Sequence, residues 1–133
     1  NLNINLKKRV LFRPLAPMIR DNLLDKYFYK TDNSVHNLYW MGLTMRARQI
    51  TKDKYPKAVH IDGTSRVQII NKNNIFYNKL FLEVEKLKID ILINTSFNVA
   101  GDPMVFDYVD CYTNMKRMDL KYLFTDDGIF EIR

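Results

Sequence analysis

The sequence predicts a mixed α/β (α+β) fold, with helices packed on a mixed sheet in one domain spanning residues 1–133. Three observations lead to this prediction. Short β-forming segments and amphipathic helical segments alternate, but without the regular strand–helix–strand rhythm of an all-parallel sheet. The chain of 133 residues has the length of one ordinary domain. Its apolar fraction of 47% suffices for one hydrophobic core and is typical of a globular chain.

The first third of the chain is expected to pass from a short strand into a helix. Residues 2–11 have a mixed character that allows a short strand. Pro14 and Pro17 disfavour a helix before them, because proline restricts its own backbone and that of the preceding residue. Residues 20–28 predict a helix, and residues 30–36 a polar loop. The apolar face of this helix comprises Ile19, Leu23, Leu24, Tyr27 and Phe28.

The middle of the chain is predicted to contain three strands. Residues 37–44 are rich in aromatic and β-forming side chains and predict the first. Residues 45–56 are rich in Lys and Arg and predict an exposed connection. Residues 58–61 and 66–70 predict two more short strands, joined by a turn of small side chains at residues 62–65.

A long amphipathic helix follows. It begins after Asn73 or Asn74, either of which can cap it, and ends near Leu87. Its apolar face comprises Phe76, Tyr77, Leu80, Phe81, Val84 and Leu87. Residues 89–93 then predict a short apolar strand.

The end of the chain predicts a helix and a hairpin. The helix covers residues 107–115, and the hairpin joins residues 122–124 to residues 129–132 across a turn at residues 126–128. No run approaches the ~20 consecutive apolar residues of a membrane span, so we expect no membrane partner.

Charge and cysteine content limit the partners to consider. The formal net charge of +6 favours anionic partners such as nucleotides, phosphates, nucleic acids or acidic lipids. The simpler alternative is a solvated basic surface, because lysines occur along the whole chain. Cys111 is the single cysteine, so the chain forms no internal disulfide and no cysteine metal site. We therefore expect a cytoplasmic protein in which Cys111 is a small buried residue rather than a nucleophile.

Four cations gather near the N-terminus: Lys7, Lys8, Arg9 and Arg13. Arg13 stands beside Pro14, whose fixed backbone restricts its position. A guanidinium group donates two parallel hydrogen bonds to a phosphate. The cluster therefore predicts a polyphosphate site, with an ordinary basic edge strand as the alternative.

A second cluster occupies residues 60–68. Gly63 lets the backbone approach a ligand closely, Thr64 and Ser65 offer hydroxyl groups, and Arg66 begins a predicted strand. Together they predict a small anion cradle. The alternative is a hairpin turn with an exposed arginine, and the histidine that opens the segment is expected to be structural.

A third cluster follows the predicted strand at residues 89–93. Asn94, Ser96 and Asn98 alternate, so an extended backbone would point them to one side. Ligands of open α/β sheets bind where strands end, and Asn and Ser can both donate to a phosphate or ribose oxygen. The alternative is a polar loop that caps its own backbone.

Several catalytic signatures are missing from the sequence. It has no Walker loop, no GxGxxG segment, no histidine-rich metal motif and no plausible Ser–His–Asp order. We expect no metal ligands in this chain.

The three clusters together resemble motifs near the C-terminus of the NodU/TobZ family of O-carbamoyltransferases. That family carries FRPFAP, HxDGTARxQ and NTSFNxxGEPxV in this order. Here the motifs stand at residues 12–17, 60–68 and 94–105, and Lys7 and Arg9 match the KxR that precedes the first motif. The departures are Leu15 for Phe, Ser65 for Ala and Asp102 for Glu.

The resemblance implies a YrdC-like twisted mixed sheet that binds ATP and carbamoyl phosphate, with Mg²⁺ accompanying the ATP. Carbamoyl phosphate is cleaved, and the carbamate attacks the α-phosphate of ATP to give carbamoyl-adenylate and pyrophosphate. Positioning and fixed charge would carry this chemistry. The residues implied in catalysis are Lys7, Arg9, Arg66 and Ser96. Those implied in nucleotide or phosphate binding are Lys7, Arg9, Arg13, Thr64, Ser65, Arg66, Asn94, Ser96 and Asn98.

The family's N-terminal transfer domain is absent from the sequence, as is the GPRALGxRS-type segment that precedes the first motif. In the family that domain holds Fe²⁺ through paired histidines and moves the carbamoyl group to a hydroxyl acceptor. We therefore expect an N-terminally truncated domain that needs a separate or removed transfer domain as its partner.

Two other functions stay open. A basic YrdC-like module could bind nucleic acid such as tRNA, with Tyr29, Tyr39 and Trp40 stacking on bases. Alternatively, the chain is a catalytically incomplete nucleotide-binding subunit of a split enzyme.

Overall fold

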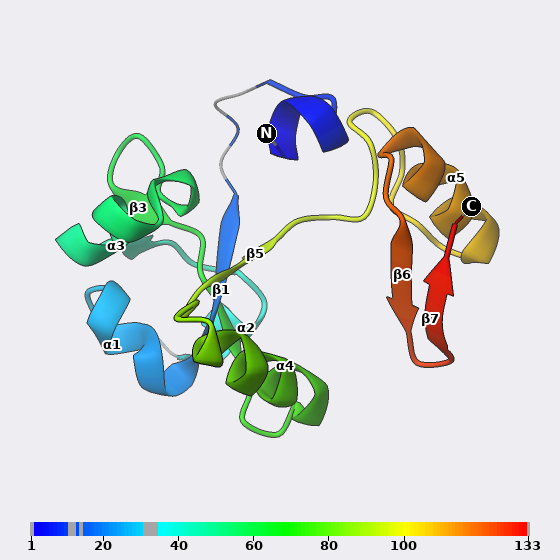
Figure 1. Cartoon of the computed structure of the whole chain (residues 1–133). Helices are drawn as coiled ribbons and strands as arrows, with labels where there is room; N and C mark the ends of the chain where they lie inside the picture. The colour runs from blue at the N-terminus through cyan, green and yellow to red at the C-terminus, as the bar shows by residue number, and fades with distance from the viewer. Residues whose placement is uncertain (1, 11–12, 14, 31–34, 133) are drawn as a thin grey trace. The chain divides into compact units, whose positions relative to one another are not determined.

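The structure is a computed structural model that describes residues 2–10, 13, 15–30 and 35–132 (Figure 1). The chain forms two compact units. The sheet unit comprises Pro14–Thr95, and the hairpin unit comprises Asn1–Arg13 together with Ser96–Arg133. Each unit has its own helices, strands and buried side chains.

A three-stranded mixed sheet lies at the centre of the sheet unit (Figure 1). Its middle strand, β1 (Ala16–Arg20), pairs in parallel with β4 (Gln68–Ile70) and antiparallel with β5 (Leu92–Asn94). The first four residues of β1 are buried, as expected of a central strand. The mixed sheet with packed helices that the sequence predicts is therefore confirmed.

The predicted helix at residues 20–28 is confirmed only in part. Arg20 is extended (ψ 147°), and a 3₁₀ turn at Asp21–Leu23 leads into the single turn of α1 (Leu24–Tyr27). Ile19, which the helical pattern included, belongs to β1 instead. The spacing of Ile19 from the apolar helix residues matched a helix face by coincidence. Both elements bury apolar side chains in the same core, although Ile19 belongs to a strand.

The strand predicted at residues 37–44 is wrong. This segment contains the end of a short helix, α2 (Val35–Tyr39), and a turn in which the Gly42 N–H donates to the Asn37 carbonyl oxygen at 2.9 Å. The aromatic content suggested a strand, but β-propensity reflects packing surroundings more than intrinsic backbone preference. Leu38, with 2% of its surface exposed, anchors α2 in the core.

The basic segment at residues 45–56 is more ordered than the predicted connection. It contains β2 (Met45–Arg46) and α3 (Gln49–Lys54). Its partner strand is β3 (Thr64–Ser65), which pairs antiparallel with β2. The strand predicted at residues 58–61 is wrong, because a 3₁₀ turn at Pro56–Ala58 occupies its start.

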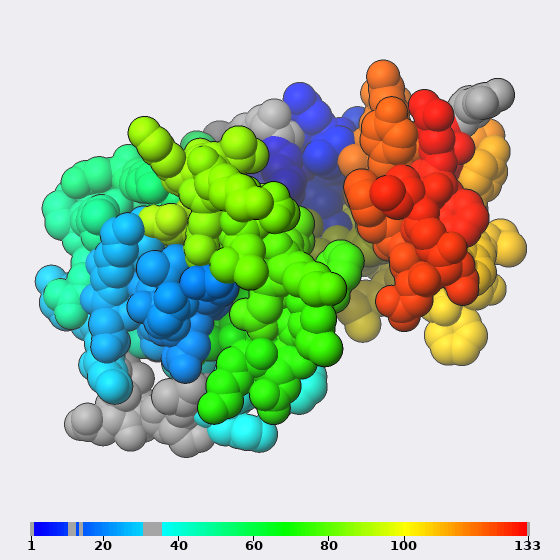
Figure 2. All heavy atoms as spheres, turned by 60° about the horizontal axis from the view of Figure 1, so that its bottom comes forward, coloured from blue at the N-terminus to red at the C-terminus, as the bar shows by residue number. Residues whose placement is uncertain are grey.

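The long helix is confirmed as α4 (Ile75–Lys86), and the Asn74 side chain caps it by accepting the Tyr77 N–H at 3.0 Å. Of the predicted apolar face, Phe81 alone is fully buried, whereas Phe76 and Leu87 are 64% and 71% exposed. Figure 2 shows this segment at the front of the sheet unit, with its side chains open to view.

The main core of the sheet unit collects side chains from β1, α1, α2, β2, β4 and the segment leading into β5. Its buried members are Ile19, Leu24, Tyr27, Phe28, Leu38, Met45, Ala47, Val67, Ile69 and Ile91. This core fixes the ends of β4 and β5, from which two of the predicted site segments emerge.

The hairpin unit combines a helical N-terminal segment with α5 and a two-stranded hairpin (Figure 1). Leu2–Leu6 form a π-helical turn, so the short strand predicted there is wrong. Helix α5 (Tyr108–Arg117) is capped by Asp107, which accepts the Asp110 N–H at 2.9 Å. The predicted helix and hairpin are confirmed; the hairpin consists of β6 (Tyr122–Thr125) and β7 (Gly128–Glu131).

Across the part of the chain that the structure describes, no helix is both long enough and apolar enough to cross a bilayer.

Candidate anion-binding site

Lys7 joins the N-terminal segment to the loop at residues 96–102, called the Ser96 loop below. Only 3% of the Lys7 surface is exposed. Its ammonium group donates to the backbone carbonyls of Ser96 and Asn98, and to the Asn98 side-chain oxygen at 3.4 Å. The Ala100 N–H donates in return to the Lys7 carbonyl oxygen at 3.0 Å. Lys7 therefore sets the shape of the Ser96 loop.

The Ser96 loop is also bonded within itself. The Ser96 hydroxyl donates to the Asn98 side-chain oxygen at 2.5 Å, and the Asn98 amide donates to the Asp102 carbonyl oxygen at 2.7 Å. These are contacts of the kind expected of a loop that caps its own backbone. Ser96 nevertheless stays exposed, so its hydroxyl group can exchange this partner for a ligand oxygen.

Asn3 holds the two arginines of the N-terminal cluster. The Arg9 side chain donates through Nε to the Asn3 side-chain oxygen at 2.8 Å, and the Asn3 amide donates to the Arg13 carbonyl oxygen at 2.8 Å. Asn3 is 5% exposed, so this contact lies inside the unit. Sequence reasoning missed Asn3, because asparagines alternate with apolar residues in this segment and nothing distinguishes Asn3 among them.

The N-terminal cations repel one another. Burial lowers the pKa of Lys7, and the charges of Arg9 and Arg13 lower it further. Burial also lowers the pKa of Arg9, with a smaller contribution from Arg13. Among the described residues, no carboxylate lies within ion-pair distance of any of these three cations. An anion placed beside them would relieve both effects.

The turn before β3 belongs to the sheet unit. Gly63 has a positive φ of 81°, which glycine adopts without strain. The Asp62 carboxylate accepts the Thr64 N–H at 2.9 Å and the Thr64 hydroxyl at 2.7 Å. The hydrogen bond from the Thr64 hydroxyl is the main cause that lowers the pKa of Asp62. This turn is thus fixed by its own side chains.

The predicted ligands of this turn differ in accessibility. Ser65 is fully buried, and its hydroxyl donates to the Ala58 carbonyl oxygen at 2.7 Å, so it supports the turn from inside. Arg66 is exposed, and within the described part of the chain its side chain has no hydrogen-bond or ion-pair partner. Arg66 is therefore the member of this group that is free to bind an anion.

A polar cavity of about 370 Å³ opens beside the same turn. Its wall includes Lys52, His60, Asp62 and Gly63. The Lys52 ammonium lies 3.6 Å from the point that a side-chain carbon on Gly63 would occupy, an ordinary contact distance, so the positive φ and not crowding favours glycine here. Lys52 was not predicted, since its segment was read only as a basic connection.

Asn94 connects the second and third motif segments inside the sheet unit. Its amide donates to the Gln68 side-chain oxygen, and the Gln68 amide donates to the Tyr39 carbonyl oxygen at 3.3 Å. Asn94 ends β5 and Gln68 begins β4, so both strands flank β1. Gln68, the last residue of the second motif, is a further contact that the sequence did not assign.

The predicted site residues therefore fall into two groups. The hairpin unit brings together Lys7, Arg9, Arg13, Ser96 and Asn98, and the sheet unit contains Thr64, Ser65, Arg66 and Asn94. Phe12 and Pro14 lie outside the described residues. Within the described ranges, no three His, Cys, Asp or Glu side chains are grouped so that they could hold a metal ion.

Comparison with known proteins identifies relatives over nearly the whole chain. A family model described as "Carbamoyltransferase C-terminus" matches residues 1–131. An uncharacterised protein of Methanocaldococcus jannaschii is 31% identical over 119 residues, which cover 83% of this chain and 19% of the relative. Nodulation protein U of Azorhizobium caulinodans is 35% identical over 97 residues, covering 71% of this chain and 17% of the relative.

A third relative has an enzymatic name. The 3'-hydroxymethylcephem-O-carbamoyltransferase of Streptomyces clavuligerus is 29% identical over 103 residues, covering 75% of this chain and 18% of the relative. The chain thus spans about a fifth of the length of the curated relatives it matches.

Proposed function

The chain belongs to the carbamoyltransferase C-terminus family, and on that premise we propose that it binds ATP and carbamoyl phosphate and forms carbamoyl-adenylate for transfer to a hydroxyl acceptor. The observation that carries the proposal is the group of three cations beside the Ser96 loop. The charges of Arg9 and Arg13 add to burial in lowering the pKa of Lys7, and the charge of Arg13 does the same for Arg9. None of the three cations has a carboxylate partner in the described chain. A triphosphate supplies the missing negative charge.

The three cations have different tasks in this proposal. All three ammonium protons of Lys7 have acceptors on the Ser96 loop, so Lys7 positions that loop and adds positive potential. Arg9 keeps its terminal nitrogens available, because its hydrogen bond to the Asn3 side chain uses Nε. Arg13 is exposed and contacts the phosphates directly.

The reaction needs charge stabilisation more than acid–base chemistry. Hydrolysis of carbamoyl phosphate by one water molecule releases phosphate and carbamate, and a carbamate oxygen then bonds to the α-phosphorus of ATP as pyrophosphate leaves. Negative charge grows on the departing pyrophosphate, where fixed guanidinium groups stabilise it. The Ser96 hydroxyl donates to a phosphate oxygen. Arg66 and Thr64 offer anion contacts within the sheet unit.

In this proposal, Mg²⁺ is bound by ATP and Fe²⁺ by a separate domain. The cationic cluster is unsuited to holding Mg²⁺ directly, so Mg²⁺ would arrive bound to the phosphates of ATP. Fe²⁺ belongs to the N-terminal transfer domain, a separate or removed partner that would move the carbamoyl group to the acceptor.

Pyrophosphate release tests the proposal. With ATP and carbamoyl phosphate together, the protein should release pyrophosphate, and omission of carbamoyl phosphate should abolish the release. Ser96→Ala should slow it by about tenfold, since one charge-assisted donor is lost. Absence of release by the wild type would instead support a catalytically incomplete subunit of a split enzyme, which copurification of a larger subunit would reveal.

A second candidate function is nucleic-acid binding. The Arg48 guanidinium stacks 4.3 Å from the centre of the Tyr29 ring, and Trp40 is 75% exposed. Exposed aromatic and cationic side chains are typical of single-strand binding surfaces. A steep loss of RNA affinity between low and high salt would favour this function. Arg48→Ala should then make the salt dependence less steep. Salt-insensitive or undetectable binding would exclude it.

A further inference from the structure

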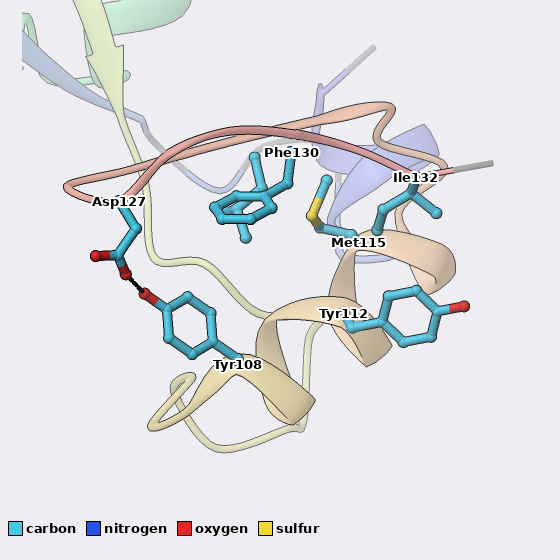
Figure 3. Close-up of a pocket in the computed structure, with 7 residues that line it drawn as sticks. Tyr108, Tyr112, Met115, Asp127, Phe130 and Ile132 are labelled. Atoms are coloured by element: carbon cyan, nitrogen blue, oxygen red, sulfur yellow. Dashed lines mark hydrogen bonds between the residues drawn. The ribbon is translucent and has the colours of Figure 1, made fainter.

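An apolar groove of about 380 Å³ lies between α5 and the β6–β7 hairpin of the hairpin unit (Figure 3). Tyr108, Tyr112 and Phe130 contribute aromatic walls, and Met115 and Leu123 lie at its base. Its size and lining fall within the range of small-molecule sites, which are mostly apolar with a few polar groups. Neither the family nor the candidate anion site accounts for it.

The groove exists because a two-stranded sheet cannot cover one helix completely. Met115 on the inner face of α5 is fully buried, whereas Tyr108 and Phe130 remain 58% and 47% exposed. An isolated hairpin is only marginally stable without further packing. Exposed aromatic surface of this kind usually marks a place where a ligand or partner binds.

The groove has one polar end. Figure 3 shows the Tyr108 hydroxyl directed at Asp127, to whose carboxylate it donates. This hydrogen bond raises the pKa of Tyr108, so the phenol stays protonated and donates to the carboxylate. In the described part of the chain, no Lys or Arg pairs with Asp127.

The surrounding sequence has the opposite charge from the rest of the chain. Residues 96–133 contain seven Asp or Glu and four Lys or Arg, although the whole chain carries a net charge of +6. The segment that builds the groove is therefore acidic, whereas Lys7, Lys8, Arg9 and Arg13 of the same unit lie in its N-terminal segment. A cationic ligand would be attracted there, whereas a nucleotide or another anion would be repelled.

We propose that this groove binds a small organic cation that carries an aromatic ring. The ring packs between Tyr108 and Phe130, because the Lys116 ammonium already lies over the Tyr112 ring, 4.6 Å from its centre. The ammonium group of the ligand pairs with the Asp127 carboxylate. Aromatic walls favour such a ligand twice, because they bury its ring and attract its positive charge.

Tryptamine and tryptophol provide matched probes, since they share an indole ring and differ in a terminal ammonium or hydroxyl group. Each is titrated into the whole protein, and amide chemical shifts are followed by NMR. Tryptamine should bind about threefold or more tightly than tryptophol, as expected of one partly exposed ion pair plus a cation–π contact. The shifts should map to α5 and the hairpin.

Two variants isolate the carboxylate. Asp127→Asn should make the two affinities equal, whereas Asp126→Asn, which changes the neighbouring acid outside the groove, should keep the preference for tryptamine. Tyr108→Phe keeps the ring and should retain tryptamine binding. Equal affinities in the wild type, shifts elsewhere in the protein, or no shifts at millimolar probe would each overturn the proposal. Binding of an ATP analogue should be unchanged by Asp127→Asn, so this test is independent of the proposed function.

Discussion

At the scale of single residues, Lys7 links two distant parts of the sequence. Its ammonium group is buried and repelled by two arginines, and yet it meets three oxygen acceptors on the Ser96 loop. The gain from these contacts must exceed the cost of burying the charge. Lys7 therefore connects local electrostatics with the geometry of the loop that presents Ser96.

Replacing Lys7 by methionine tests this role. Lys7→Met keeps the apolar stem but leaves buried carbonyl oxygens without donors, so the free energy of unfolding should fall by about 1–3 kcal/mol. Denaturant unfolding measures the loss, and faster hydrogen exchange at Ala100 would locate it. Lys8→Met, at an exposed neighbour, should change little. Equal stability of the two variants would mean that Lys7 does not hold the loop.

Sequence motifs named Lys7, Arg9, Ser96 and Asn98, and the structure places these four residues in one unit. Their role in binding stays a prediction. No sequence pattern pointed to Asn3, Lys52 or Gln68, because their contacts join segments that are separated along the chain. Ser65 matched a motif position, but its hydroxyl group is turned into the core.

At the scale of secondary-structure elements, local signals decided which predictions succeeded. The caps Asn74 and Asp107 and the turn at residues 126–128 mark α4, α5 and the hairpin from within a few residues. Residues 37–44 lack such signals, and their aromatic side chains suit a helix or a strand equally well. Packing of Leu38 into the main core stabilises the helix, and no periodicity in the sequence indicates that packing.

Removal of the α5 cap should weaken the hairpin unit. Asp107→Ala deletes the acceptor for the Asp110 N–H and should cost about 1 kcal/mol of unfolding free energy. Thermal unfolding measures this loss. Glu131→Ala also removes a carboxylate but caps no helix, so its effect should be near zero. Identical melting temperatures for Asp107→Ala and the wild type would contradict the capping role.

The segment before β5 is fixed by an ionic cluster that should make the sheet unit sensitive to acid. Asp90 accepts hydrogen bonds from the Tyr27 hydroxyl and from Lys26 at 2.9 Å, and Lys54 lies 3.7 Å away. Burial alone would raise the pKa of Asp90, but these partners together lower it below its usual 3.8. The lowered pKa means that the folded state prefers the ionised carboxylate.

The sign of the pH effect follows from that preference. The contribution of Asp90 is fully present above pH 3.8 and is lost as the pH falls below it, through the lowered pKa of the folded state. Asp90→Asn should therefore reduce stability at pH 7 by about 1 kcal/mol, because both lysine partners are roughly half exposed. It should also flatten the loss of stability in acid. An unchanged acid profile, measured by urea unfolding between pH 7 and pH 3, would contradict this role.

At the scale of the whole molecule, charge is divided between parts of the chain. The excess of Lys and Arg lies in residues 1–95, and the acidic excess lies in residues 96–133. The N-terminal segment of the hairpin unit supplies cations to the Ser96 loop, and its C-terminal part forms the apolar groove. The proposed anion site and the proposed cation site thus lie in one unit, and they should be independent in titrations.

The fold class could be predicted from the sequence because composition and alternating patterns report the kinds of element. The pairing of β1 between β4 and β5 could not, since strand order depends on contacts between residues 16–20, 68–70 and 92–94.

Isothermal titration with a non-hydrolysable ATP analogue tests the central claim most directly. The wild type should bind the analogue, and Arg13→Ala should weaken binding by about tenfold, because it removes a charge-assisted contact to phosphate. Arg46→Ala, which removes an exposed arginine that the site does not use, should bind as the wild type does. Equal affinity of the wild type and Arg13→Ala would contradict the account.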